Sequence, residues 1–308
     1  MTDTGPSMRL AVIVPAYNEH ASITATVSGL RALQPTLETL GLGLWIIVID
    51  DGSSDDTASL AREAGADRVV RHRRNSGLGA AVRSGLRAAH QDDADIVVKF
   101  DADLQHRPED IPELVQPILD DSADVVYGNR FQRIEYTMPV VRRWGNVVFT
   151  RLMGWLTGWP LKDGQPGIFA INRDYLSQFY LPGDYNYTQQ ILIDAYRKGM
   201  RFAHVPVTFR PRRTGRSFIS LKYPFKVLPQ IFMVLVAVRP LKIFGPMGMV
   251  FLLLGLGIGV TELIQWFLGL SYKPVLHVNL VLGLTLFGLQ TLFFGVLAHL
   301  IVDVRNGR

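Results

Sequence analysis

Apolar and amphipathic segments alternate along the first 130 residues of the chain. Short apolar runs with the character of buried strands lie at residues 9–15, 44–49, 69–70, 96–100 and 125–127. Segments with the apolar spacing of helices lie between them, at residues 21–33, 57–64, 80–89 and 111–119. This alternation predicts an α/β domain with a mostly parallel sheet. Because ligands bind at the carboxyl ends of such strands, the loops after the strands are the candidate functional sites.

A segment that is both aromatic and basic follows at residues 139–160. Its apolar positions fall on one helical face, and Arg142, Arg143 and Arg151 lie partly off that face. Tryptophans flank the segment at positions typical of a membrane interface. The pattern predicts an amphipathic helix that lies on a membrane surface, with a buried core helix as the alternative.

The C-terminal third contains two long apolar stretches. Residues 243–261 carry no charge, the apolar character continues to residue 270, and residues 278–302 contain no Asp, Glu, Lys or Arg. Each stretch is long enough to cross a hydrocarbon core of roughly 30 Å. We expect a transmembrane hairpin with spans at about 243–270 and 278–302, rather than two core helices of a soluble protein. Glu262 lies near the end of the first span, which favours a place at the far interface.

Basic residues flank the predicted hairpin on both sides. They are Lys222, Lys226, Arg239, Lys242, Arg305 and Arg308. We expect this bias to place the large N-terminal domain and both termini in the cytoplasm, and the two spans to make the chain an integral protein of the cell membrane. We expect three parts: a domain at 1–222, an interfacial helix or linker at 223–242, and the hairpin at 243–308. The first seven residues are polar, so we expect no signal peptide.

Composition narrows the chemistry further. The 308 residues include no cysteine, which excludes disulfides, thiolate metal sites and a cysteine nucleophile. The net charge of +5 arises from acidic and basic residues that are interspersed along the chain, and no nucleic-acid recognition motif is present. We therefore expect no nucleic-acid partner.

The strongest chemical signal follows the apolar run at 96–100. Asp101 and Asp103 are two residues apart at the strand exit, and Gln105 adds a neutral oxygen. Oxygen ligands of this kind suit Mg²⁺ or Mn²⁺, which commonly bind through one or two carboxylates and substrate phosphates. An isolated Asp-x-Asp is a weak signal, but this one stands at the end of a buried strand beside a second acidic loop.

That second loop contains Asp50 and Asp51, followed by Gly52, Ser53 and Ser54. We expect one of the two carboxylates to accept a hydrogen bond from a base or ribose, and the other to cap the following helix. The loop after the first strand offers the Tyr17 ring for stacking and the Glu19 carboxylate for hydroxyl groups. The turn at 75–79 is built of small residues that allow a close backbone approach, as a plain turn also would.

Together these segments resemble the family 2 inverting glycosyltransferases. The motifs are Pro15-Ala-Tyr-Asn-Glu19, Asp50-Asp-Gly-Ser53, Asn75-Ser-Gly-Leu-Gly79 and Asp101-Ala-Asp-Leu-Gln105. With Gly128-Asn-Arg130 and the hairpin, the resemblance narrows to polyprenyl-phosphate glycosyltransferases, a subgroup that includes dolichyl-phosphate mannose synthase and bactoprenol glucosyltransferase. It implies a Rossmann-like nucleotide-sugar-binding domain of the GT-A type.

The resemblance also implies roles for individual residues. Residues implied in nucleotide binding are Pro15, Tyr17, Glu19, Asp50, Asp51, Asp101, Arg212 and Lys222. The metal would be held by Asp101, Asp103 and Gln105, and the acceptor phosphate by Arg130, Arg142, Arg143 and Asn146. Asp103, Arg130 and Arg212 are implied as catalytic residues. Phe169 and Gln190 depart from the family pattern, where arginine and an acidic residue are often found.

The implied reaction is inverting transfer of one hexose, with Mg²⁺ or Mn²⁺ as cofactor. The donor would be GDP-mannose or UDP-glucose and the acceptor a membrane polyprenyl phosphate, and the spans are compatible with a homo-oligomer. One alternative is a processive polysaccharide synthase, but the Gln-x-x-Arg-Trp motif of those enzymes is absent because Val140 precedes Arg143-Trp144. The other is a membrane-tethered nucleotide-sugar-binding protein without activity, which would be expected to have lost metal ligands.

Overall fold

The computed structural model describes residues 8–134, 147, 150–151, 153–155, 157–164, 166–181, 187–210, 236 and 240–305. The chain divides into two compact units, Met1–Ser217 and Phe218–Arg308. Much of the predicted membrane-surface helix at 139–160, and the predicted domain boundary at residue 222, lie outside the described residues.

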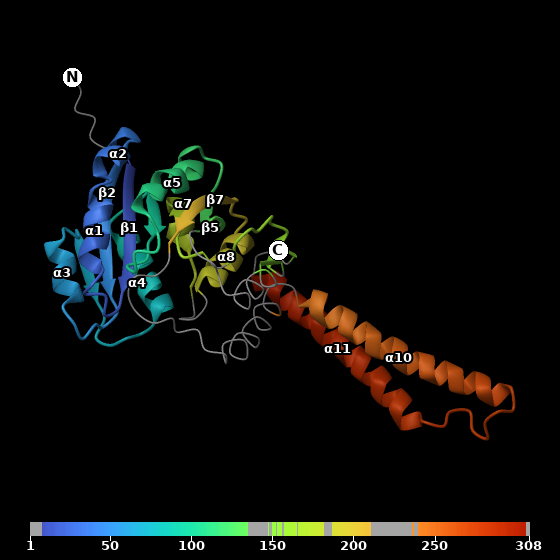
Figure 1. Ribbon diagram of the computed structural model, residues 1–308. Coiled ribbons are helices and arrows are strands. Elements are labelled where there is room, and N and C mark those ends of the chain that lie inside the picture. The colour runs from blue at the N-terminus through green and yellow to red at the C-terminus, as the bar shows by residue number, and fades with distance from the viewer. Residues whose placement is uncertain are drawn as a thin grey trace. The chain divides into compact units, whose positions relative to one another are not determined.

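The first unit is built on a mixed sheet (Figure 1). Its described strands are β1 (Met8–Ala16), β2 (Leu42–Asp50), β3 (Arg68–Arg71), β4 (Ile96–Lys99), β5 (Val125–Ile134), β6 (Phe169–Asn172) and β7 (Phe202–Phe209). The order across the sheet is β3-β2-β1-β4-β6-β5-β7. The pairs β3-β2, β2-β1, β1-β4 and β5-β7 are parallel, which confirms the predicted α/β class with a mostly parallel sheet.

Helices cover both faces of this sheet. They are α1 (Ile23–Arg31), α2 (Gln34–Thr39), α3 (Thr57–Glu63), α4 (Leu78–Gln91), α5 (Ile111–Leu119), α7 (Arg173–Gln178) and α8 (Tyr187–Arg197), with a 3₁₀ turn at Pro108–Asp110. Val12 of β1 packs in one core with Val27 of α1, whereas Ile13 faces the opposite way, toward Gly85 of α4. This two-sided burial explains why the parallel strands are continuous apolar runs.

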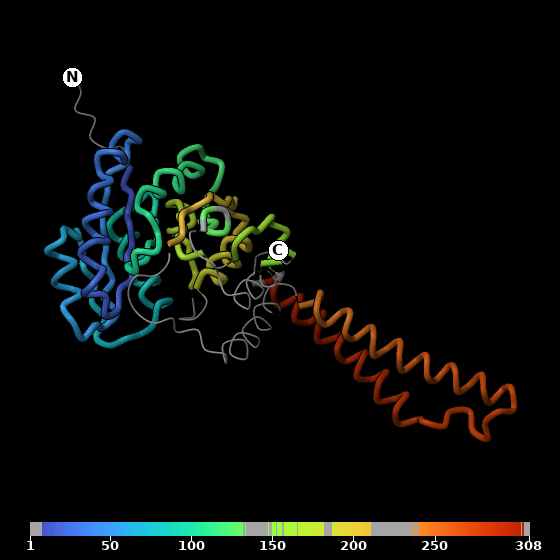
Figure 2. The backbone as a smooth tube through the Cα atoms, viewed as in Figure 1, coloured from blue at the N-terminus to red at the C-terminus, as the bar shows by residue number. Residues whose placement is uncertain are grey.

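Strand β6 runs against its neighbours and was not predicted from the sequence. It is antiparallel to both β4 and β5, with Phe169 opposite Lys99 and Tyr127. Figure 2 shows the path of the chain through this unit, in which green and yellow segments from later in the sequence lie beside the blue N-terminal ones. Because β6 is reversed, the residues before Phe169 lie at the edge of the sheet where β4 ends.

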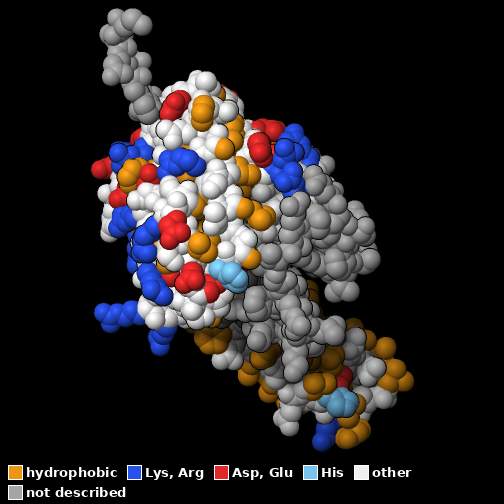
Figure 3. Space-filling model, turned by 60° about the vertical axis from the view of Figure 1, so that its left-hand side comes forward, with side chains coloured by type: hydrophobic (Ala, Val, Ile, Leu, Met, Phe, Trp, Pro, Cys, Tyr) orange, Lys and Arg blue, Asp and Glu red, His pale blue; other side chains and the backbone are white. Residues whose placement is uncertain are grey.

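The second unit is a hairpin of α10 (Leu241–Phe267) and α11 (Val278–Arg305), as expected for the C-terminal third. Both helices are long and apolar enough to cross a membrane. They pack closely, since a Cβ atom at Gly288 would lie 2.5 Å from the backbone nitrogen of Leu252. Hydrophobic side chains dominate the surface of the hairpin, whereas charged side chains are scattered over the first unit (Figure 3).

Glu262 fastens the connection between the two helices. Its carboxylate accepts hydrogen bonds from the backbone N–H groups of Leu276 (2.9 Å) and His277 (3.1 Å), and contacts the His277 ring at 2.5 Å. The buried carboxylate thus satisfies backbone donors at the start of α11.

Candidate active site

Three loops meet at one edge of the sheet. They follow β1, β2 and β4, which are neighbours in the order β2-β1-β4, so the three loops leave adjacent strands at their carboxyl ends. These loops contain Tyr17–Glu19, Asp50–Ser53 and Asp101–Gln105. The structure therefore gathers the sequence motifs of the first 105 residues at the edge where an α/β sheet binds ligands.

The loop after β4 is held by an internal hydrogen bond and by contacts with the residue that follows β7. The Asp103 carboxylate accepts a hydrogen bond from the backbone N–H of Gln105 at 3.1 Å. The Gln105 side-chain amide donates to the carbonyl of Arg210 at 3.1 Å, and the Arg210 N–H donates to the Gln105 carbonyl at 2.8 Å. Leu104 between them adopts a positive φ of 60°. The loop is a tight turn tied to the end of β7.

The oxygen atoms of this loop fit a divalent cation. Asp101 and Asp103 are both partly exposed at the end of a buried strand, as an accessible metal site requires. Within the described part of the chain, no three His, Cys, Asp or Glu residues form a closed metal-binding group. The role of Asp101, Asp103 and Gln105 as ligands of a divalent cation stays a prediction; Mg²⁺ commonly binds through one or two carboxylates together with substrate phosphates.

Asp101 is paired with a buried lysine that the sequence analysis did not single out. Lys99 Nζ donates to Asp101 Oδ1, and also to the carbonyl of Gly167 at 2.6 Å. Burial alone lowers the pKa of Lys99, but the Asp101 carboxylate outweighs it and the pKa is raised, so the lysine is charged. The sequence signal that could have identified Lys99 is that it is the single charged residue in the apolar run 96–100.

His106 lies on the other side of Asp101. Its Nε2 atom is 3.9 Å from Asp101 Oδ2, and its ring packs 5.0 Å from that of Phe209. Burial lowers the pKa of His106 to about 4 against the opposing effect of Asp101, with further lowering by Lys99 and Arg130, so the ring is neutral at physiological pH.

Asp51 organises the turn that precedes α4. One carboxylate oxygen lies 2.6 Å from His72 Nδ1 and 2.9 Å from the N–H of Ser76, and the other accepts from the N–H of Gly77 at 2.8 Å. Gly52 lies against the same turn at φ +75°, where a Cβ atom would be 2.5 Å from the carbonyl carbon of Arg74. Only glycine allows this approach.

Asp50 is fully buried and accepts from the N–H of Ser53 at 2.9 Å, while Arg71 Nε lies 3.1 Å from its second oxygen. The expectation that Asp50 or Asp51 caps the following helix is wrong. Helix α3 begins after Asp56 without a side-chain cap, and Asp55 accepts from the N–H of Thr57 at 3.1 Å instead. Asp51 instead accepts from backbone N–H groups of the turn before α4, at Ser76 and Gly77.

The loop after β1 offers an exposed aromatic ring. Tyr17 is 44% exposed, whereas Pro15 is buried in β1. Glu19 accepts from the Ser22 hydroxyl at 2.6 Å, and the N–H of Asn18 donates to Ser53 at 2.9 Å, which joins this loop to the loop after β2. The nucleotide-binding roles of these residues stay predictions.

Arg130 is buried and has a carboxylate partner. Its Nε atom lies 2.9 Å from Asp163 Oδ2, and the Asp163 side chain is fully buried. The guanidinium also lies 5.5 Å from the centre of the Phe209 ring. Asp163 was not among the predicted site residues, since nothing in the local sequence indicates a partner 33 positions from Arg130.

Five predicted site residues lie outside the described residues. They are Arg142, Arg143, Asn146, Arg212 and Lys222. Their predicted roles with the acceptor phosphate and the nucleotide stay predictions. Of the two departures from the family pattern, Phe169 is buried in β6 and Gln190 lies in α8.

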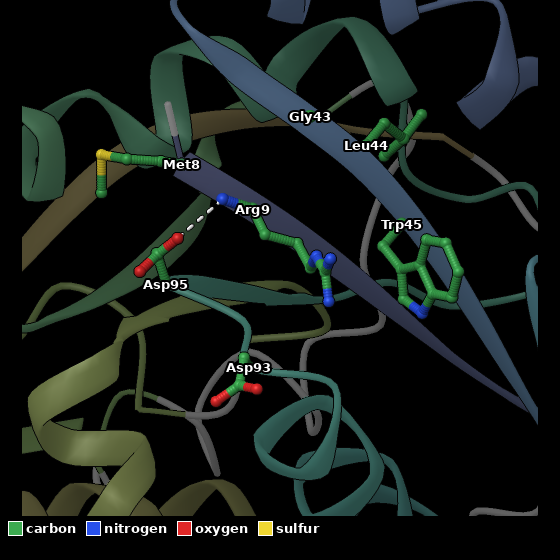
Figure 4. Close-up of a pocket in the computed structure, with 7 residues that line it drawn as sticks. All are labelled: Met8, Arg9, Gly43, Leu44, Trp45, Asp93 and Asp95. Carbon is green, nitrogen blue, oxygen red and sulfur yellow. Dashed lines mark hydrogen bonds between the residues drawn. The ribbon is translucent and has the colours of Figure 1, made fainter. Parts of the chain in front are cut away.

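A separate cavity of about 410 Å³ lies away from these loops (Figure 4). It is lined by Met8, Arg9, Gly43, Leu44, Trp45, Asp93 and Asp95. These residues stand at the amino ends of β1 and β2 and just before β4, and Asp95 accepts a hydrogen bond from the Arg9 N–H at 2.7 Å. The cavity is therefore at the opposite edge of the sheet from the candidate active site.

The chain is similar in sequence to enzymes that transfer sugars to lipid phosphates. The N-acetylglucosaminyltransferase of Methanococcus voltae that acts from UDP-N-acetylglucosamine on dolichyl phosphate is 30% identical over 217 residues, covering 64% of this chain and 83% of that protein. The undecaprenyl-phosphate mannosyltransferase of Micrococcus luteus is 30% identical over 228 residues, which cover 69% of this chain and 88% of that protein.

A solved structure shares the fold. Glucosyl-3-phosphoglycerate synthase from Mycobacterium tuberculosis, in complex with Mn²⁺, UDP and glucosyl-3-phosphoglycerate, has a TM-score of 0.57 and 25% identity, covering 76% of this chain and 80% of that one. The model of the family described as glycosyl transferase family 2 matches residues 11–179, which include every motif from Asp50 to Arg130. The chain is therefore a glycosyltransferase that belongs to glycosyl transferase family 2.

Proposed function

We propose that the chain transfers a single sugar from a nucleotide-diphosphate sugar to a membrane polyprenyl phosphate, with inversion at the anomeric carbon. The observation that carries this proposal is the Asp101–Gln105 loop at the carboxyl edge of the sheet, in a chain that also has two apolar helices of membrane-spanning length. The two relatives act on dolichyl phosphate and undecaprenyl phosphate, which supports a lipid phosphate as acceptor.

The donor diphosphate would bind at the loop after β4. Asp101, Asp103 and Gln105 would hold a divalent cation there, and the related synthase was solved with Mn²⁺ and UDP. When bound, such an ion offsets the negative charge that develops on the leaving diphosphate. The exposed ring of Tyr17 stands at the neighbouring loop, where it offers a stacking surface for the nucleotide base.

The acceptor needs positioning more than it needs deprotonation. A phosphate monoester is already anionic at neutral pH, so its oxygen attacks the anomeric carbon without a strong general base. Arginine guanidinium groups match phosphate oxygens in bidentate geometry. Arg130, Arg142, Arg143 and Asn146 are the residues proposed for this task, and Arg212 and Lys222 are proposed to contact the donor phosphates.

The apolar hairpin would hold the enzyme at the membrane that contains its acceptor. Basic residues lie next to both ends of the hairpin, including Lys242 before it and Arg308 after it, which favours cytoplasmic placement of both termini and of the catalytic unit. The nucleotide sugar would then be taken from the cytoplasm and the lipid phosphate from the inner leaflet.

The proposal is tested with the full chain purified in detergent. Radiolabelled GDP-mannose, UDP-glucose and UDP-N-acetylglucosamine are each incubated with a polyprenyl phosphate and Mn²⁺, and the label is followed into the organic phase. One donor is expected to give a lipid carrying one sugar, and Asp103→Asn is expected to lower the rate at least about 100-fold. Asp120→Asn, an exposed carboxylate outside the candidate site, is the matched control and should leave the rate unchanged.

Three outcomes would contradict the proposal. The label stays in the aqueous phase with every donor, the lipid product carries a chain of sugars, or Asp103→Asn is as active as the unaltered protein. Transfer to free phosphoglycerate in place of the lipid would indicate a soluble acceptor like that of the related synthase.

A further inference from the structure

Lys99 is a fully buried cation directly beneath the candidate metal loop. It is the last residue of β4, and its three preceding neighbours in that strand, Ile96 to Val98, are apolar and buried. Among the described residues its ammonium group contacts the Asp101 carboxylate and the Gly167 carbonyl, and it also interacts with the Tyr187 hydroxyl. A lysine is rarely buried in this way unless it is paired.

The surroundings are shaped to keep this pair in place. Gly167 can bring its carbonyl within 2.6 Å of Lys99 only because it has no side chain. A Cβ atom there would lie 2.2 Å from His106 Nε2 and 2.9 Å from Asp101 Oδ2. The ring of Tyr187 closes the site, with its centre 5.6 Å from Lys99 Nζ.

The pair changes the charge that a metal ion would meet. Asp101 and Asp103 together carry two negative charges, and the Lys99 ammonium cancels one of them at Asp101 Oδ1. Only Asp101 Oδ2, which faces His106 at 3.9 Å, is not used by Lys99. Because water is excluded around the lysine, its charge acts on a nearby cation with little screening.

We propose that Lys99 is a positioning residue that fixes the Asp101 carboxylate. Lys99 also neutralises part of the negative charge that this carboxylate offers to a divalent ion, and it thereby weakens metal binding by the free enzyme. This inference rests on the proposed metal-assisted function. With Lys99 in place, the divalent ion is expected to bind firmly only when the donor diphosphate adds its own negative charge to the site. The apolar alternative at residue 99 would give a site that retains the metal without substrate.

The experiment measures binding of Mn²⁺ alone to the full chain in detergent, from the electron paramagnetic resonance signal of free Mn²⁺. Lys99→Gln removes the charge but keeps N–H donors for the Asp101 and Gly167 oxygens, so it separates charge from hydrogen bonding. We expect Lys99→Gln to bind Mn²⁺ at least about fivefold more tightly than the unaltered protein. Lys99→Arg, which keeps the charge, should stay within about twofold of it.

Two further variants make the result interpretable. Arg107→Gln removes an exposed cation from the same loop and should change Mn²⁺ affinity less than about twofold, because water screens that charge. Asp103→Asn should abolish binding in either background. If Lys99→Gln fails to fold, Lys99→Met is measured in its place, with the same expected gain in affinity.

The outcomes separate this inference from the proposed function. If the unaltered protein binds Mn²⁺ and transfers sugar, but Lys99→Gln or Lys99→Met binds Mn²⁺ equally or more weakly, the role given to Lys99 is wrong and the proposed function stands. If the unaltered protein transfers sugar but does not bind Mn²⁺ with or without the donor, the metal site and the role of Lys99 are both wrong.

Discussion

The guanidinium of Arg130 is held by the carboxylate of Asp163, with Nε and Oδ2 2.9 Å apart and both side chains almost fully buried. A buried pair of this kind leaves a costly unpaired charge when either partner is removed. Arg130 is therefore part of the structure beneath the site as well as a proposed contact of the acceptor phosphate.

Arg130→Ala is expected to lower the free energy of unfolding by about 3–5 kcal/mol, because the buried Asp163 carboxylate then loses the guanidinium that offsets its charge. Arg130→Lys keeps a positive charge and should lose less. If Arg130 also contacts the acceptor, Arg130→Lys should raise the KM for polyprenyl phosphate far more than the KM for the nucleotide sugar. Thermal unfolding and the two KM values are the measurements, and equal changes in both KM values would count against the acceptor role.

Asp51→Ala should loosen the turn at Asn75–Gly77. The substitution removes the acceptor for two backbone N–H groups and for His72, with an expected loss of about 2–3 kcal/mol in stability. Because this turn adjoins the proposed nucleotide site, the Kd for UDP or GDP should rise by about tenfold. The matched control is Asp56→Ala, whose side chain makes no capping bond at α3. An unchanged nucleotide affinity in Asp51→Ala would remove the turn from the binding site.

The sequence and the structure agree where local patterns decide the outcome. Continuous apolar runs identified β1 to β5, because a strand covered on both faces has few polar positions, and two stretches without charge identified the hairpin. The parallel strand β7 was not predicted. Strand β6 was missed because its place between β4 and β5 depends on pairing between distant segments. The partners of Lys99 and Arg130 were missed for the same reason, since Gly167 and Asp163 lie 68 and 33 positions away.

His204 should make the stability of the catalytic unit fall at mildly acidic pH. Burial lowers the pKa of His204 to about 4, although Asp163 opposes the change, and the ring accepts a hydrogen bond from the Lys162 N–H at 3.0 Å. An unfolded histidine has a pKa of about 6.5, so between pH 6.5 and 4 the unfolded chain binds more protons. Stability is therefore full above pH 6.5 and falls by about 1.4 kcal/mol per pH unit below it for this group.

The measurement is the shift of Tm between pH 6.5 and pH 5. His204→Phe fits the aromatic surroundings of Phe202 and Tyr127 and should lose about 4 °C less than the unaltered protein over this range. His90→Gln, at an exposed position on α4, is the control and should follow the unaltered protein. Identical shifts in all three proteins would show that His204 is not buried in its neutral form.

Glu262→Ala should release the connection between α10 and α11. The N–H groups of Leu276 and His277 lose their acceptor, so their hydrogen exchange should become at least about tenfold faster. Glu262→Gln keeps an acceptor oxygen, so its exchange rates at these two amides should lie between those of the unaltered protein and those of Glu262→Ala. Exchange measured by mass spectrometry on the full chain tests this, and unchanged exchange at both amides would show that Glu262 does not fasten the turn.

The most direct test of the whole account is the anomalous scattering of Mn²⁺ in crystals of the full chain grown with Mn²⁺ and a nucleoside diphosphate. We expect one strong peak within about 2.5 Å of carboxylate oxygens of Asp101 and Asp103, with the diphosphate beside it. A diphosphate bound at the carboxyl edge of the sheet with no manganese beside these two aspartates would contradict it.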